Sequence, residues 1–582
     1  MNHLVSAVFM SYRYSSAIAA AVIAYLLAST SAASAAESSR RFSTYANPID
    51  LPYRYQSSSR APYREAADPT VVYFKDRYWL FPSHSLGYWW STDLLRWTFV
   101  AGQGYDVGKF APTVVAMNGR LYLTTSLRAK KIWVTDDPLS GLWTEAGDVS
   151  PGFDDPAMLL DDDGRLYMYE GISPKGVLRA HELDPKTFQR LKSIDIPESR
   201  DTERRGWEVV GDNNDNFTKP SYIEGAWTTK HDGRYYLQYA APGTHYKSYA
   251  DGLLIADKPL GPFVYQQYSP ISLKPTGFIA GAGHGSIFRG SPGQWWEAST
   301  MTISIRHRFE RRLGLFPASF TRSGELVVDT YLGDYPRYAD GDRGPTGWML
   351  LSRKKPVSAS SSLEGFPVEN AADEEIRSWW SAATGDRDEW YQVDLGAPKT
   401  IQAVQINFAD QDAVARGISN DVYKYVLELS DDGQAWRTAI DESQRGRDAP
   451  HDYQVLTEPT RARFVRLRNV HMPDSAKFSL YDLRVFGTGD GKHPASVTAL
   501  KAQRSAVDGR KLHMEWKPAA GAEFHIVRLG TRGGPLNQNY QVYDGKAVLD
   551  VASLNIGIGY CFSVDAVNEN GIRRGKKKQC VR

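Results

Sequence analysis

Residues 68–81 read DPTVVYFKDRYWLF, and this plan recurs along the chain: a polar or small start, an apolar strand, a tight turn and an aromatic strand. The other copies are residues 111–124 (APTVVAMNGRLYLT), 155–169 (DPAMLLDDDGRLYMY), 224–239 (EGAWTTKHDGRYYLQY) and 284–299 (HGSIFRGSPGQWWEAS). Turn signals such as Asn118-Gly119 and Asp232-Gly233 between alternating apolar runs are typical of β-hairpins. Five similar units at regular spacing predict an all-β repeat fold, a five-bladed β-propeller.

Three of the five copies begin with a carboxylate, at Asp68, Asp155 and Glu224. Equivalent positions of different blades meet around a propeller axis, so these acids are expected to converge on one pocket. Glycosidic bond cleavage with inversion needs a base that activates water and an acid that protonates the leaving oxygen, roughly 6.5–9.5 Å apart. A third carboxylate can raise the pKa of the acid. For any one Asp-Pro or Glu-Gly pair an ordinary turn is the better interpretation, but three in register favour a shared site.

Length and composition set broad limits. A chain of 582 residues predicts two to four domains. A net charge of +2 gives no electrostatic case for nucleic acid. The 16 Trp and 33 Tyr suit sugar stacking, but they suit β-rich cores equally well.

The N-terminal residues 1–36 have the pattern of a secretory signal peptide. Arg13 precedes an apolar run at residues 16–27 (SAIAAAVIAYLL), and Ala33-Ser34-Ala35 is a small-residue cleavage site. A membrane anchor is the less favoured alternative, because the run is shorter than the roughly 20 residues a span needs. We therefore expect a secreted or periplasmic monomer with no membrane span in the mature chain.

The repeat pattern defines a first domain at residues 37–352. A basic, Pro- and Ser-containing stretch at residues 353–362 (RKKPVSASSS) predicts a linker, residues 363–488 a second β-rich domain, and residues 495–582 a small β-sandwich. The two cysteines, Cys561 and Cys580, are expected to pair in an oxidising compartment, with two free thiols as the alternative.

Residues 46–340 resemble glycoside hydrolase family 43, whose members are five-bladed propellers that cleave by inversion. The matching segments are Ala67-Asp68-Pro69, Asp154-Asp155-Pro156-Ala157 and Tyr222-Ile223-Glu224-Gly225-Ala226. The resemblance implies that Asp68 is the general base, Asp155 the pKa modulator and orienting residue, and Glu224 the general acid. The chain departs from the commonest family pattern where Glu224 is followed by Gly-Ala rather than Gly-Pro. Asp154 is an alternative modulator.

His284 begins the fifth repeat. In related family members a histidine at this position lies at the propeller axis near a water-coordinated calcium or other ion, so the resemblance implies a polar anchor beside the substrate. A histidine satisfied by backbone carbonyls is an equal alternative.

Aromatic and basic side chains near the repeats are candidates for sugar binding, although blade packing competes for each aromatic ring. The candidate substrate-binding residues are Trp89, Phe110, Trp207, His245 and His284. The fifth repeat also carries a basic cluster, Arg306, His307, Arg311 and Arg312. A solvated strand face with one buried ion pair is the favoured interpretation, and the alternative is that one member reaches the pocket and holds a hydroxyl or carboxylate.

Residues 363–488 resemble the discoidin-like (F5/8 type C) domain of coagulation factors 5 and 8, which is shared with carbohydrate-binding module family 32. The supporting segments are Asn370-Ala371-Ala372-Asp373, Trp379-Trp380-Ser381, residues 390–396 (WYQVDLG) and residues 430–436 (SDDGQAW). The resemblance implies a jelly-roll sandwich, a galactose-type sugar ligand and a structural calcium near Asp373. Residues 495–582 resemble a fibronectin type III domain with Trp516 and Tyr560 in its core.

The sequence therefore predicts an exported inverting glycoside hydrolase. The family favours removal of terminal arabinofuranosyl, xylosyl, galactosyl or galactofuranosyl units from plant or microbial polysaccharides and oligosaccharides. No cofactor is expected to be required, and calcium would be structural only. The alternative is a non-catalytic carbohydrate-binding propeller, which predicts the loss of one of the three acids; all three are present.

Overall fold

The computed structural model describes residues 43–56, 62–290, 293–340 and 343–582. The chain divides into two compact units, residues 1–44 and 45–582, and the predicted signal peptide lies outside the described residues. The described part is all-β, and its helices are short 3-10 turns: η1 (Pro197–Ser199), η2 (Gly206–Glu208), η3 (Val368–Ala371) and η4 (Pro473–Ser475). Within this part no helix is both long and apolar enough to cross a membrane.

The five sequence repeats form five successive antiparallel sheets. The first sheet is β4 (Thr70–Phe74), β5 (Arg77–Phe81), β6 (Gly87–Ser91) and β7 (Thr98–Ala101), and the second is β8 (Thr113–Met117), β9 (Arg120–Thr124), β10 (Ala129–Thr135) and β11 (Thr144–Phe153). The third is β12 (Ala157–Leu160), β13 (Leu166–Glu170), β14 (Leu178–Leu183) and β15 (Arg190–Ile196). The fourth is β16 (Glu224–His231), β17 (Arg234–Ala241), β18 (Ala250–Ala256), β19 (Val264–Tyr265) and β20 (Ser272–Leu273), and the fifth is β21 (Ala280–Arg289), β22 (Trp295–Thr302), β23 (Arg311–Phe320) and β24 (Leu326–Val328).

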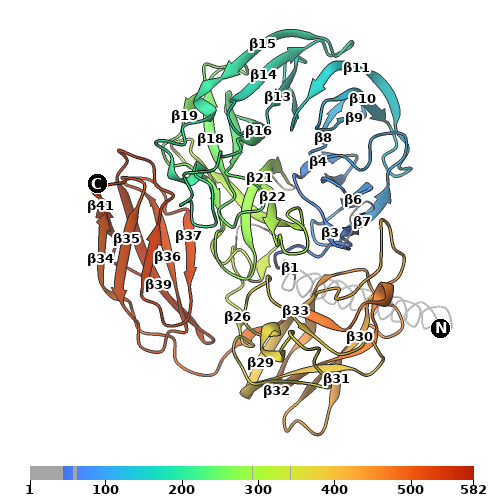
Figure 1. Ribbon diagram of the computed structural model, residues 1–582, viewed down its shortest axis with the longest axis vertical. Helices are drawn as coiled ribbons and strands as arrows, with labels where there is room; N and C mark the ends of the chain where they lie inside the picture. The colour runs from blue at the N-terminus through green and yellow to red at the C-terminus, as the bar shows by residue number, and fades with distance from the viewer. Residues whose placement is uncertain (1–42, 57–61, 291–292, 341–342) are drawn as a thin grey trace, which may run out of the picture. The chain divides into compact units, whose positions relative to one another are not determined.

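These sheets follow one another around a closed, propeller-like ring (Figure 1). The first strand of each sheet contacts the first strand of the next, in the order β4, β8, β12, β16 and β21, and β21 returns to contact β4. The predicted hairpin turns supply the backbone geometry that this needs: Asn118 and Gly119 have φ of 52° and 72°, in the left-handed region typical of a type I′ turn. Because the first strands all lie at the ring centre, residues at their starts come together.

An eight-stranded sheet follows the ring, and we call this domain the middle sandwich. Its strands are β26 (Met349–Leu350), β27 (Val357–Ala359), β28 (Trp380–Ser381), β29 (Trp390–Phe408), β30 (Lys424–Ser430), β31 (Arg437–Asp441), β32 (His451–His471) and β33 (Ser479–Thr488). β26 pairs with β33, and β27 pairs with β29. The structure thus differs from the predicted linker at residues 353–362, because Val357 and Ala359 pack on the sandwich core and the domain already begins at β26.

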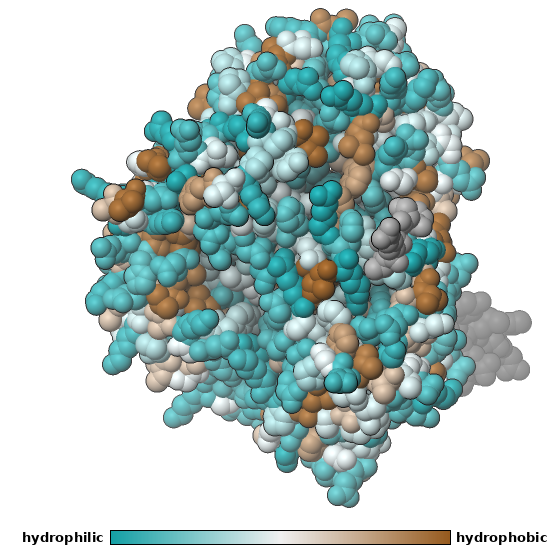
Figure 2. Space-filling view, viewed as in Figure 1, coloured by the Kyte–Doolittle hydropathy of each residue, from teal (hydrophilic) through white to brown (hydrophobic). Residues whose placement is uncertain are grey.

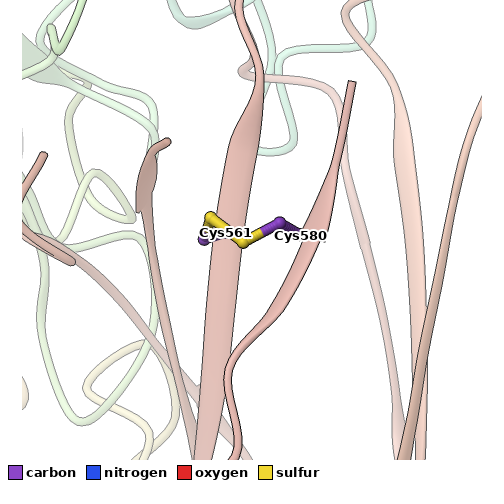
Figure 3. Close-up of a disulfide and its surroundings, with 2 residues drawn as sticks. All are labelled: Cys561 and Cys580. Carbon is purple, nitrogen blue, oxygen red and sulfur yellow. A yellow bond between two sulfur atoms is a disulfide. The ribbon is translucent and has the colours of Figure 1, made fainter. Parts of the chain in front are cut away.

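The C-terminal residues form a second sandwich of two facing sheets, which we call the C-terminal sandwich. One sheet is β34 (Thr498–Arg504), β35 (Leu512–Lys517) and β38 (Val548–Val551); the other is β36 (Phe524–Thr531), β37 (Gln538–Val542), β39 (Tyr560–Asn568), β40 (Gly571–Arg573) and β41 (Gln579–Val581). Trp516 and Tyr560 are buried in its core, as predicted. Cys561 on β39 and Cys580 on β41 are directly paired across the strands and form a disulfide (Figure 3).

Four two-residue strands complete the described structure: β1 (Thr44–Tyr45), β2 (Arg54–Tyr55), β3 (Arg64–Glu65) and β25 (Arg337–Tyr338). β2 and β3 form a small hairpin before the first sheet. Tyr55 of this hairpin is part of the middle sandwich's apolar core. The ring and the middle sandwich therefore share a buried boundary.

On the face drawn in Figure 2 the surface is mostly hydrophilic, and the apolar residues on it are scattered.

Candidate active site

A cavity of 320 Å³ at the starts of the ring strands contains all three predicted acids and His284. Each of the five sheets contributes an acid, the histidine or an aromatic wall residue, and the fourth and fifth sheets add hydroxyl and cationic groups. The lining residues are Asp68, Phe110, Ser126, Leu127, Asp155, Ile172, Tyr222, Glu224, Gly243, Thr244, His245, His284, Arg308, Phe309 and Arg311. The predicted convergence of Asp68, Asp155 and Glu224 is therefore seen in the structure.

The strand starts share a left-handed backbone conformation. It occurs, with φ of 49°, 38°, 45°, 62° and 47°, at Asp68, Ala111, Asp155, Gly225 and His284. Glu224 therefore stands one residue before the register that Asp68 and Asp155 occupy, which corrects the expectation that all three acids are equivalent. Glycine is required at position 225, because a Cβ there would lie 2.7 Å from Cγ of His284 as well as being strained by the positive φ.

Asp68 is held by a cation and two hydroxyls. Arg311 Nη1 donates to both of its carboxylate oxygens, at 3.0 and 3.1 Å, and Ser83 Oγ donates to Oδ2 at 2.6 Å. The Asp68 backbone N–H donates to Thr300 Oγ1 at 2.7 Å. Burial raises the pKa of Asp68, but Arg311, His284 and the Ser83 hydrogen bond outweigh it and hold the pKa below the usual 3.8. Asp68 is thus a carboxylate at neutral and mildly acidic pH.

Within the part of the chain that the structure describes, no cation is in hydrogen-bond contact with Glu224. Tyr249 OH donates to its Oε1 at 2.7 Å. Burial raises the pKa of Glu224 to about 7 against the lowering effect of this hydrogen bond, and the negative charge of Asp68 adds to the rise. Glu224 therefore carries a proton up to near neutral pH, which is the state a general acid needs.

His284 lies between Asp155 and Asp68. Ser126 Oγ donates to Asp155 Oδ1 at 2.8 Å, and burial raises the pKa of Asp155 to about 7, opposed by His284 and reinforced by the charges of Glu224 and Asp68. His284 Nδ1 is 3.3 Å from Asp68 Oδ1 and 3.9 Å from Asp155 Oδ2. The His284 backbone N–H donates to Asp251 Oδ1 at 2.8 Å, which fixes the ring between the two carboxylates.

Arg311 is the member of the basic cluster that reaches the cavity, although sequence alone did not single it out. It is 2% exposed, and besides Asp68 it contacts Thr244 Oγ1 and Glu65. The other members of the cluster have partners elsewhere: Arg306 pairs with Glu310, His307 stacks on Tyr63, and Arg312 donates to His451. Alternation along β23 was the available signal, because it separates Arg311 and Arg312 onto opposite faces.

Two of the predicted sugar-binding rings do not reach the cavity. Trp89 is 0% exposed and packs on Phe99 within the first sheet. Trp207 is also 0% exposed; it packs on Tyr239, and its Nε1 donates to Tyr265 OH. The prediction of a sugar contact is wrong for both, because these rings fill the core.

Phe110 and His245, by contrast, line the cavity as predicted. Phe110 packs edge-on against Phe309 at 5.4 Å, so the two rings form one wall. Leu127, Ile172 and Tyr222, at 52%, 37% and 42% exposed, form a rim that was not predicted. The interior of the site is therefore polar and its mouth apolar.

Within the described residues no three His, Cys, Asp or Glu side chains come together as ligands for a metal ion. Asp373 accepts hydrogen bonds from Ser378 Oγ at 2.6 Å and from the Glu375 backbone N–H at 2.9 Å. The nearby Asp482 has a buried Oδ1 with no hydrogen-bond partner among the described residues, and oxygen ligands of this kind suit calcium. Calcium near Asp373, or near His284, stays a prediction.

Comparisons with known families agree with the two main resemblances. The family pattern of "Glycosyl hydrolases family 43" matches residues 63–324, and that of "F5/8 type C domain" matches residues 356–482. The first match contains all three acids of the cavity. The chain thus contains a family 43 domain and an F5/8 type C domain, and the middle sandwich is the latter.

Individual relatives are more distant. A "Putative beta-xylosidase" of Escherichia coli (strain K12) is 26% identical over 37% of this chain and 43% of its own length. An "Arabinoxylan arabinofuranohydrolase" of Paenibacillus polymyxa is 29% identical over 30% of this chain and 32% of its own. A solved "Glycoside hydrolase" structure is 19% identical, covers 72% of this chain and 97% of its own, and has a TM-score of 0.43. The chain thus spans less than two thirds of the length of either curated relative.

Proposed function

We propose that this protein is an inverting glycoside hydrolase that removes terminal sugar units. The observation that carries the proposal is one cavity lined both by a carboxylate paired with Arg311 and by a second carboxyl group that has no paired cation among the described residues. Such an asymmetric pair separates the two roles of the reaction, since one group stays ionised while the other stays protonated.

In the proposed mechanism, Asp68 acts as the general base. Its low pKa keeps it ionised, and it takes a proton from the attacking water, while Arg311 and Ser83 fix its orientation. Glu224 acts as the general acid and gives its proton to the leaving glycosidic oxygen. Because Tyr249 occupies Oε1, we assign the transferred proton to Oε2. We assign Asp155 the role of modulating the pKa of the acid: its own pKa is raised to about 7, partly by the charge of Glu224, so the two groups titrate together. His284 lies beside it, with Nδ1 3.9 Å from Asp155 Oδ2.

The proposed substrates carry terminal pentosyl or related units. Curated relatives are named for xylosidase and arabinofuranohydrolase activities, which favours xylosyl and arabinofuranosyl units over galactosyl and galactofuranosyl ones. A cavity of 320 Å³ suits the end of a sugar chain better than its middle.

The finer architecture belongs to the same proposal. The five-sheet ring would be the five-bladed β-propeller of family 43, and the C-terminal sandwich a fibronectin type III domain, as its two facing sheets of three and five strands suggest. We propose that the protein is exported after removal of the predicted signal peptide and works as a monomer. A structural calcium at Asp373 is part of this proposal.

The proposal is tested with a panel of aryl glycosides, namely arabinofuranoside, xyloside, galactofuranoside and galactopyranoside, and with the matching oligosaccharides. Glu224→Gln should lose hydrolysis of oligosaccharides by about 10²–10⁴-fold while the fold persists. NMR of the first-formed product should show the inverted anomer. Near-normal oligosaccharide hydrolysis by the variant would remove Glu224 from its role, and a retained anomer would refute inversion.

A further inference from the structure

The loop at residues 303–310, between β22 and β23, forms one wall of the cavity. It carries Arg308 and Phe309 to the lining and leads directly into Arg311, the partner of Asp68. The loop is folded on itself, since the Ile303 N–H donates to the Glu310 carbonyl at 3.0 Å and the Ser304 hydroxyl donates to the Arg308 carbonyl at 2.9 Å.

This loop is held from outside by the middle sandwich. Tyr481 OH, on β33, accepts a hydrogen bond from Arg306 Nη1 at 2.6 Å and donates to Glu310 Oε1 at 3.1 Å. Arg306 Nη2 donates to the Ala409 carbonyl, and its guanidinium lies 5.0 Å from the ring centre of Trp379. Glu310 is 0% exposed and immediately precedes Arg311. Only one peptide link therefore separates a group held by the sandwich from the arginine that holds the proposed base.

A second cavity loop has a similar support. Residues 243–245 line the cavity, and two positions further along Lys247 Nζ lies 2.9 Å from Glu375 Oε2 of the middle sandwich. The Lys247 backbone N–H donates to Asp212 Oδ1 at 2.7 Å, and Asp212 Oδ2 is 3.1 Å from Arg377 Nη1, again of the sandwich. Glu375 and Arg377 thus hold this loop from both sides.

The boundary between ring and sandwich is itself buried and charged. Arg64 pairs with Asp410 at 2.8 Å and with Asp448 at 2.7 Å, and its side chain is 1% exposed. A buried ion pair that loses one partner leaves an uncompensated charge, so this boundary resists opening. The sandwich is therefore fixed against the ring, and its contacts can hold the two loops in one position.

We propose that the middle sandwich is a structural part of the active site, in which Tyr481 and Glu375 are positioning residues for the two cavity loops. The catalytic consequence rests on the proposed glycosidase function, whereas the positioning itself does not. Removing the Tyr481 hydroxyl takes away the hydrogen bond that ties Glu310 to the sandwich and one of the ties of Arg306, which keeps its bond to the Ala409 carbonyl. This loosens the wall residue Phe309 and the orientation of Arg311. Displacements of about 1 Å in such groups cost up to about 10²-fold in rate.

The positioning is tested by hydrogen–deuterium exchange of the full chain, compared among Tyr481→Phe, Glu375→Lys and a control, Arg463→Glu. The control breaks an ion pair of the same kind inside the sandwich, Arg463 with Asp394 at 2.7 Å, which touches neither loop. We expect amides of residues 303–311 to exchange at least threefold faster in Tyr481→Phe, and those of residues 243–248 in Glu375→Lys, with no change in the control. Unchanged exchange in both loops would overturn the proposal.

Kinetics then tests the consequence. Glu375→Lys should raise KM about three- to tenfold, and the double variant Lys247→Glu with Glu375→Lys should restore it to within about twofold, since the ion pair is re-formed with reversed charges. Tyr481→Phe should lower kcat as well, because Arg311 is affected. If the unaltered protein hydrolyses no glycoside, the proposed function fails while the exchange experiment still decides the positioning. Faster exchange with unchanged KM and kcat would limit the sandwich to a stabilising role and refute its part in the site.

Discussion

Asp68 at the start of the first sheet and Glu224 at the start of the fourth are both buried acids in the same cavity, yet their pKa values move in opposite directions. Burial raises the pKa of both groups. The difference lies in their partners: Asp68 is paired with the guanidinium of Arg311, whereas Glu224 accepts a hydrogen bond from the phenol of Tyr249 and, among the described residues, has no paired cation. The paired cation, and not the depth of burial, therefore decides which acid stays ionised and which stays protonated.

The largest expected effect separates the two roles by leaving group. Asp68→Asn should lower kcat/KM by about 10²–10⁴-fold on every substrate, since activation of water is needed whatever group departs. Glu224→Gln should lose as much on oligosaccharides but far less on a dinitrophenyl glycoside, whose leaving group needs no proton. Kinetics of both variants on both substrates measures this. Equal leaving-group dependence in the two variants would break the assignment of roles.

A smaller effect is expected when the cation is removed. Arg311→Met takes away the main influence that lowers the pKa of Asp68, so this pKa rises and the acidic limb of the pH–activity profile moves upward. We expect kcat/KM to fall about 10–100-fold near pH 5, with Arg311→Lys falling less because it keeps the charge. The pH dependence of kcat/KM checks both. An unmoved acidic limb in Arg311→Met would show that Arg311 does not set the state of Asp68.

Tyr249→Phe should have a smaller effect, on the alkaline limb of the pH–activity profile. The Tyr249 hydrogen bond lowers the pKa of Glu224, so its loss raises that pKa and extends activity to higher pH. We expect an upward movement of the alkaline limb by less than about one pH unit. A downward movement would mean that Tyr249 instead stabilises the protonated acid.

The last effect concerns stability instead of rate. The pKa of Glu224 is higher in the folded chain, about 7, than the ordinary 4.5, so the folded state binds more protons and loses stability as pH rises between these values. Glu224→Gln removes this loss, so its free energy of unfolding should exceed that of the unaltered chain by about 3 kcal/mol at pH 7, with almost no gain at pH 4. Thermal unfolding at both pH values measures the difference. A gain that is equal at both would contradict a raised pKa.

Much of the ring and the identity of its acids could be predicted from sequence. Hairpin turns and alternating strands can be recognised from a few neighbouring residues. Asp68 and Asp155 occupy the same position in two of the five repeats, and this predicts that they meet at the ring centre. The one-residue offset of Glu224 could not be seen, because it depends on the left-handed backbone at Gly225 and on the nearby His284 ring. Family resemblance, not register, supplied its role.

Whether a given side chain lies in the core or in the cavity was less predictable. Trp89 and Trp207 were expected at the sugar site but lie in the core, because a tryptophan beside a strand suits either place by composition. Arg311 was one of four cluster members, and only the fold shows that it faces Asp68. The contact of Tyr481 with Glu310 joins residues 171 positions apart, and no local pattern marks such a pair.

The most direct measurement is the pH dependence of kcat/KM for the unaltered enzyme on its best oligosaccharide. We predict that activity falls above about pH 7, because the coupled carboxyl groups of Glu224 and Asp155 ionise there. On the acidic side we predict that activity persists to below pH 4, because Asp68 remains a carboxylate. Activity that keeps rising above pH 7, or that is already lost near pH 6 on the acidic side, would contradict opposite pKa shifts in the two acids.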